Sequence, residues 1–160
     1  MRKPVYYLIL AVLISSCSHR IVRTGYQANK SGYRNCDIAI SKNLSISDSL
    51  QKLGEIKIGE SGFSVSCSEA DAIEILKNEG CALNADIINI TLEKRPDLLS
   101  SCYRCNAEFY KNLNSSVKVQ SDEIYKPENV NNRTSSDRNK NTGMIIGALI
   151  GGFIVGLLIF

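Results

Sequence analysis

Four short stretches of the chain have the patterns of β-strands, and three of them alternate between hydrophobic and polar residues, as strands with one buried face do. The alternation is clearest in the second stretch, where Ile56 and Ile58 fall on one face. In the third stretch Ile87 and Ile88 are adjacent, which indicates a strand that is buried on both faces. The predicted strands cover residues 36–40, 55–59, 86–92 and 102–111.

One main helix is predicted between the second and third strands. Ser68 and Asp71 have the spacing of a capping box, with Asp in place of the usual Glu. Hydrophobic residues then recur at helical spacing until Gly80, where we expect the helix to end. A shorter helical turn is predicted for residues 48–53, just before Gly54. The hydrophobic positions of the main helix are Ala70, Ile73 and Leu76.

The order strand, strand, helix, strand, strand predicts an α+β domain, in which one main helix packs on a small antiparallel or mixed sheet. This domain occupies residues 33–113. At roughly 80 residues a hydrophobic core alone stabilises a fold weakly, and cross-links commonly assist. We therefore expect a disulfide-bonded domain.

The N-terminus has the pattern of a secretory signal peptide. Arg2 and Lys3 precede residues 5–14, an apolar run that is too short to span a hydrocarbon core of about 30 Å. The motif Ile-Ser-Ser-Cys that ends at Cys17 resembles the lipobox of bacterial lipoproteins. The resemblance implies that residues 1–16 are removed and that Cys17 carries lipid. The alternative is an ordinary signal peptide with small residues at its cleavage site.

Residues 17–32 are polar and unpatterned, and we interpret them as the lipidated N-terminus followed by a flexible tether. By resemblance to the sorting rules of enteric bacteria, Ser18 after the cysteine favours the outer membrane, with the domain facing the periplasm. The sequence therefore predicts a protein of the cell envelope.

The C-terminus is a second candidate membrane segment. Residues 114–142 are polar, which predicts a disordered linker. Residues 143–160 carry no charge, and as a helix these 18 residues would reach about 27 Å, enough to cross a thin bilayer. Glycines at four-residue spacing form a glycine zipper, which favours close helix packing in lipid and a homo-oligomer. They are Gly143, Gly147, Gly151, Gly152 and Gly156.

The tail leaves two alternatives open. One is a purely structural protein that assembles oligomers in the membrane through the glycine zipper, with the domain as a spacer. The other is a GPI-anchored cell-surface protein, because small residues at 134–137 precede the apolar C-terminus.

Charge and composition exclude several functions. The chain has 19 Lys and Arg against 16 Asp and Glu, and removing Arg2 and Lys3 leaves 17 against 16. This balance argues against a nucleic-acid partner, which needs a concentrated basic face. The single histidine, His19, leaves few options for acid–base catalysis or metal binding, and no phosphate loop or nucleophile motif is present. We predict a non-enzymatic protein without a cofactor, a metal or catalytic residues.

The cysteines carry the remaining candidate chemistry. Six cysteines become five once Cys17 is assigned to lipid, and an exported chain reaches a compartment in which disulfides form. Cys102 and Cys105 have the spacing of a thiol-redox motif, although they open a strand rather than a helix. Together with Cys67 and Cys81, the same pair would make a four-cysteine zinc site. Structural disulfides are the interpretation that we favour.

Four short motifs support a family resemblance: Leu-Gly-Glu at residues 53–55, Cys67 before the helix, Ala82 with Ala-Asp at residues 85–86 after it, and Cys-Tyr-Arg at residues 102–104. In this order they resemble the RcsF-type envelope-stress lipoproteins and, more distantly, the YbjQ-like domains. The resemblance implies an α+β fold, a disulfide between Cys67 and Cys102, and a role in sensing or signalling through envelope protein partners.

The second disulfide is left open by this resemblance. The family's other cysteine falls where this chain has Thr91 and Leu92, so Cys36, Cys81 and Cys105 leave three pairings. We favour Cys81 with Cys105, because the end of the helix and an inward-facing strand position can approach each other.

Overall fold

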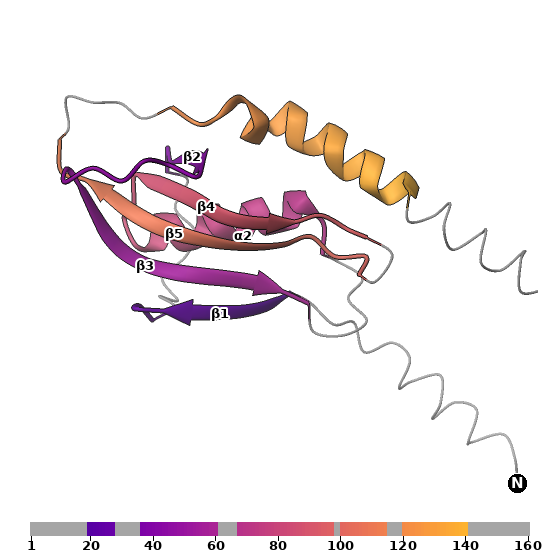
Figure 1. The fold of residues 1–160 in the computed structure, drawn as a ribbon, viewed down its shortest axis with the longest axis horizontal. Helices are drawn as coiled ribbons and strands as arrows, with labels where there is room; N and C mark the ends of the chain where they lie inside the picture. Colours follow the sequence, from indigo (N-terminus) through magenta and orange to yellow (C-terminus); the bar gives the residue numbers. More distant parts are fainter. Residues whose placement is uncertain (1–18, 28–35, 61–66, 98–99, 115–119, 141–160) are drawn as a thin grey trace, which may run out of the picture.

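A computed structural model describes residues 19–27, 36–60, 67–97, 100–114 and 120–140. Within these residues a five-stranded sheet carries helices on one face (Figure 1). The predicted signal peptide at residues 1–16, the lipidated Cys17 and the glycine-rich segment at residues 143–160 lie outside the described residues. None of the described helices is long and apolar enough to cross a membrane.

The described strands form a sheet with the order β1-β3-β5-β4-β2. β2 runs parallel to β4, and the other neighbours are antiparallel. The predicted α+β class, with a mixed sheet, is therefore confirmed. The elements are β1 (Arg20–Thr24), β2 (Ala39–Lys42), β3 (Leu50–Gly59), α2 (Glu69–Ala82), β4 (Ile87–Lys94), β5 (Arg104–Asn112), the 3-10 turn η1 (Glu123–Tyr125) and a helix over residues 127–140, which we call the C-terminal helix.

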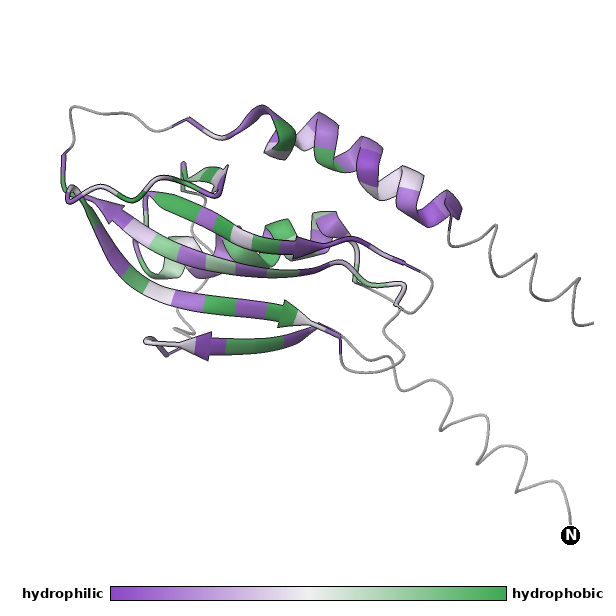
Figure 2. Ribbon diagram, viewed as in Figure 1, coloured by the Kyte–Doolittle hydropathy of each residue, from purple (hydrophilic) through white to green (hydrophobic). Residues whose placement is uncertain are grey.

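Hydrophobic and polar residues alternate along the strands (Figure 2), so that one face of the sheet packs on the helices and the opposite face, which we call the open face, carries more polar side chains. On β5, Cys105, Ala107 and Phe109 are buried, whereas Arg104 and Glu108 are partly exposed. The buried side chains pack in one hydrophobic core with residues of α2 and of the C-terminal helix. Both helices therefore lie on the same face, and no described helix covers the other face.

The sequence accounts for most of α2. Its capping box forms as predicted: Ser68 Oγ accepts from the Asp71 backbone N–H at 3.2 Å, and the Asp71 carboxylate accepts from the Ser68 N–H at 3.0 Å. The predicted end at Gly80 is wrong, because the helix continues to Ala82. A Cβ atom at Gly80 would lie 2.5 Å from Ile38 Cδ1, so this glycine permits close packing rather than ending the helix.

The predicted helical turn at residues 48–53 is also wrong. β3 begins at Leu50 and pairs with β5 from this first residue, which lies opposite Asn112. The register shifts between Lys52 and Gly54, which is a bulge that bends the long strand. Pairing with a strand about 60 residues away overrides the local preference for a turn.

Part of the predicted tether at residues 17–32 is β1, the edge strand beside β3. Arg23 on β1 forms an ion pair with Glu79 of α2. Just after β1, Tyr26 packs edge-on against Phe109, with 5.7 Å between the ring centroids. These contacts fix the segment to the core, so the interpretation as a flexible tether is wrong for this part.

The predicted disordered linker at residues 114–142 is wrong for residues 120–140. Asp122 hydrogen-bonds to β2 through its backbone N–H and its carboxylate. Tyr125 and Val130 are buried in the core, at 2% and 4% exposure. The domain therefore extends past its predicted C-terminal boundary and includes the C-terminal helix.

Candidate functional site

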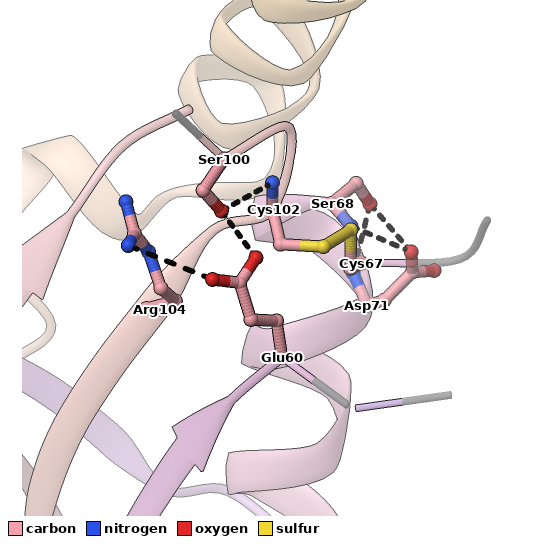
Figure 3. The surroundings of a disulfide bond; sticks show 7 residues. All are labelled: Glu60, Cys67, Ser68, Asp71, Ser100, Cys102 and Arg104. Atoms are coloured by element: carbon pink, nitrogen blue, oxygen red, sulfur yellow. Dashed lines mark hydrogen bonds and ion pairs between the residues drawn. A yellow bond between two sulfur atoms is a disulfide. The ribbon is translucent and has the colours of Figure 1, made fainter. Parts of the chain in front are cut away.

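The disulfide that the resemblance implied is present at one end of the sheet (Figure 3). Cys67 immediately precedes the capped start of α2, and Cys102 lies two residues before β5. The Cys67 carbonyl accepts a hydrogen bond from the Tyr103 N–H at 2.8 Å. The bond therefore joins the start of the helix to the start of the central strand.

Polar side chains surround this disulfide (Figure 3). Ser100 Oγ accepts from the Cys102 N–H at 3.3 Å and donates to Glu60 Oε2 at 2.5 Å. Arg104 forms an ion pair with Asp97 at 3.0 Å and lies 4.0 Å from Glu60. The two acidic side chains here are thus engaged by neighbours.

The second disulfide joins Cys36 to Cys81, so the predicted pairing of Cys81 with Cys105 is wrong. The chain that leads into β2 packs against α2 where Ile38 meets Gly80, and this contact brings Cys36 to the end of the helix. Cys105 is a free cysteine, and it is buried among core side chains of β5.

Neither alternative cysteine chemistry fits this arrangement. Cys102 is bonded to Cys67 and not to Cys105, and burial raises the pKa of the Cys105 thiol to about 12. A redox pair needs a reactive thiolate, which this environment disfavours. The zinc hypothesis fails because the thiols of Cys67, Cys81 and Cys102 are used in disulfides. The described part of the chain contains no group of three or more candidate metal ligands.

A buried ionic network, which no sequence pattern indicated, lies at the start of α2, and we call it the Glu69 network. The Glu69 side chain is only 1% exposed. Arg133 of the C-terminal helix donates to both of its carboxylate oxygens from Nε at 3.1 Å, and Arg95 donates to Oε2 at 3.1 Å. Arg95 also forms an ion pair with Asp137 at 2.6 Å. The network therefore ties the C-terminal helix to α2 and to the end of β4.

A second polar cluster holds η1, the 3-10 turn that precedes the C-terminal helix, against β4. Glu93 of β4 accepts from Tyr103 at 3.3 Å and from Tyr125 at 3.1 Å, and it forms an ion pair with Lys42 at 3.0 Å. Burial alone would raise the pKa of Glu93, but the contacts with Lys42 and the two tyrosines outweigh it and lower the pKa below its usual value. Burial raises the pKa of Tyr125, so this phenol remains a donor.

The polar groups of these two clusters hold segments of the chain together. The carboxylates of Glu69 and Glu93 accept hydrogen bonds from arginines or phenols of other segments of the chain. A sequence signal for the C-terminal helix does exist, because its partly or fully buried positions recur at helical spacing: Asn129, Val130, Arg133, Thr134 and Asp137. A hydrophobicity pattern misses this face because four of the five residues are polar.

The candidate site is thus an ionic docking surface between the domain and the C-terminal helix. The RcsF-type resemblance and its signalling role remain predictions that rest on the four short motifs. Comparisons of this chain with protein-family models, with curated proteins and with solved structures find no match.

Proposed function

We propose that this protein is a non-enzymatic, membrane-anchored envelope lipoprotein whose domain binds other envelope proteins and responds to them through the C-terminal helix. One observation carries the proposal: Arg133 and Asp137 of the C-terminal helix are held by ion pairs of the Glu69 network. Such a helix is an element that a protein partner can hold in place or release.

The composition of the helix supports this role. Half of residues 127–140 are Asn, Ser or Thr, which favour helices less than Ala by roughly 0.5 kcal/mol each. The total is about 4 kcal/mol, a cost that tertiary contacts must offset. Val130 is the one fully buried residue within the described helix. The charged contacts of Arg133 and Asp137 add to the burial of Val130 in holding the helix in place.

The geometry of the chain ends also supports attachment to one membrane. Arg20, at the start of β1, lies opposite Gly59 at the end of β3. Asp137, near the end of the C-terminal helix, contacts Arg95, which follows the end of β4. Both ends of the described chain therefore leave the domain on the same side (Figure 1). A lipid on Cys17 and a membrane segment at residues 143–160 would then reach the same bilayer.

The membrane half of the proposal is tested by Cys17→Ala in the native host. We expect the wild type to incorporate a labelled fatty acid and the variant to incorporate none. Equal labelling of both proteins would contradict the lipoprotein assignment.

The partner half is tested by placing a photo-reactive amino acid at an exposed position of the C-terminal helix, Asn132, and at an exposed position of α2, Glu74, as a matched control. We expect the first probe to cross-link a discrete envelope protein in living cells and the second to give a different pattern. Failure of the Asn132 probe to cross-link any protein would contradict a role of this helix in partner binding.

A further inference from the structure

The open face of the sheet carries a row of side chains that the register places across four strands. Val22 of β1 lies opposite Lys57 of β3, which lies opposite Asn106 of β5, and Asn106 lies opposite Leu92 of β4. Directly opposed residues in antiparallel strands share a face. At about 4.8 Å per strand, the row crosses roughly 14 Å of surface.

A second row lies beside the first, toward the side from which both chain ends leave. Arg20 of β1 lies opposite Gly59, and Lys94 of β4 lies opposite Arg104. We call the exposed side chains of the two rows the end patch, which consists of Arg20, Val22, Lys57, Leu92 and Lys94.

The end patch combines exposed apolar groups with cations. Val22 and Leu92 are 44% and 46% exposed, although they lie in strands whose other aliphatic residues are largely covered. Each has a cation next to it in the same strand on the same face, Arg20 beside Val22 and Lys94 beside Leu92. Lys57 lies between them. Apolar side chains flanked by Lys and Arg are the composition of surfaces that lie at a membrane interface.

The cations of the end patch have no ion-pair partner within the described residues, whereas the nearby acids are occupied. Glu60 and Asp97 are engaged by Arg104 and Ser100. One row further along the same face, Glu55 and Glu108 share an ion pair with Lys52. The uncompensated charge of the end patch is therefore positive, at one end of a chain that is nearly neutral overall.

We propose that the end patch binds the anionic headgroups of a lipid bilayer. This inference rests on the proposed membrane attachment, and it adds which surface of the domain faces the lipid. A bilayer is the occupant that fits best, because the patch lies on the side where the chain ends leave and because it pairs apolar tips with cations. Each Lys or Arg close to an anionic surface strengthens binding about five-fold, and salt weakens the effect.

The test uses the full chain in lipid nanodiscs made of phosphatidylcholine alone or of phosphatidylcholine mixed with phosphatidylglycerol. Acetylation of Lys57 and Lys94 is measured by mass spectrometry, with Lys126 as the internal control because it is exposed and precedes the C-terminal helix at the far end. We expect both patch lysines to react several-fold more slowly in the anionic discs. High salt should remove this protection, and Lys126 should react equally in both discs.

A pair of variants tests whether the cations of the end patch cause the slow acetylation of its lysines in anionic discs. Arg20→Gln with Lys57→Gln should restore fast acetylation of Lys94 in anionic discs. Lys77→Gln with Lys126→Gln removes the same charge from the helix-covered side of the domain and should leave Lys94 protected. All four side chains reach solvent, so both variants should have the same melting temperature as the wild type.

The outcomes separate this inference from the proposed function. If the chain inserts into both discs and the patch lysines react equally in them, the lipid-facing patch is refuted and the membrane attachment stands. If the lysines become protected only when an acidic envelope protein is added, the patch is a protein interface and the inference is again refuted. A chain that joins neither disc would refute both.

Discussion

The two helices on the covered face are attached to it in opposite ways. α2 buries Ala72, Ile73 and Leu76 against the sheet and begins with a complete capping box. The C-terminal helix has the same length over its described residues, but it buries Val130 and otherwise presents charged and polar groups inward. α2 is therefore stabilised by the same hydrophobic burial that forms the core. The C-terminal helix has fewer hydrophobic contacts and several ion pairs, and we expect its docking to be lost at a lower free-energy cost than that of α2.

The largest expected effect comes from cutting the disulfide at the start of α2. In the chain-entropy model, a loop closed by Cys67 and Cys102, which are 35 residues apart, contributes about 4 kcal/mol of stability. Cys67→Ser with Cys102→Ser should lower the melting temperature by roughly 15 °C. Thermal unfolding of the solubilised full chain, followed by circular dichroism, measures this. Melting within a few degrees of the wild type would show that the bond does not stabilise the domain.

A pair of truncations compares the hydrophobic contacts of the two helices directly. Leu76→Ala on α2 should lower the free energy of unfolding by about 3 kcal/mol, because the side chain is fully buried. Val130→Ala removes two methyl groups, one carbon atom fewer than Leu76→Ala, and should cost about 1.5 kcal/mol. Chemical denaturation of both variants gives the two values. Equal losses would mean that the C-terminal helix is as much a part of the core as α2.

Breaking the Glu69 network should affect one helix and spare the other. Glu69→Gln removes the charge that Arg133 and Arg95 share, at a cost of about 2 kcal/mol, since both arginines retain some access to water. Amide hydrogen exchange should become fast over residues 127–140 and stay slow in β5. Glu74→Gln, at an exposed position of α2, is the matched control. Uniform acceleration across both helices would contradict independent docking.

The smallest expected effect is a response to acid. The pKa of Glu93 is lowered from 4.5, so its contacts with Tyr125 and Lys42 contribute stability that is fully present above about pH 4.5. That contribution is lost as the pH falls through the lowered pKa. Exchange of the amides around η1 should therefore accelerate below pH 4.5, and Glu93→Gln should accelerate it at neutral pH and flatten the dependence. An unchanged pH profile in this variant would assign the response to other carboxyls.

Sequence patterns predicted the parts of the fold that hydrophobic burial determines. The strands around Ile56, Ile88 and Phe109 and the helix around Leu76 all place apolar side chains at the spacing of their element. The Cys67 to Cys102 bond was implied by the resemblance and is present. Each of these features follows from a pattern that can be seen in one sequence: hydrophobic spacing within an element, or short motifs that resemble those of a known family.

The missed parts depend on partners that are distant in sequence. β1 is five residues long and becomes a strand only because the end of β3 lies beside it. The pairing of Cys36 with Cys81 follows from a glycine that brings the chain onto α2, which no spacing rule reveals. The Glu69 network needs Arg95 and Arg133 from two other elements, and neither arginine differs in sequence from a surface residue.

The buried Cys105 has a consequence for how the disulfides form. In the unfolded chain Cys102 and Cys105 are only three residues apart, and closing so short a loop is the most frequent encounter that an oxidant could trap. Once β5 is in the sheet, the Cys105 sulfur is enclosed by the core and its thiolate form is suppressed, so it no longer attacks its neighbours. Burial in the core thereby withdraws the Cys105 thiol from exchange, and Cys36, Cys67, Cys81 and Cys102 are the described cysteines left to pair.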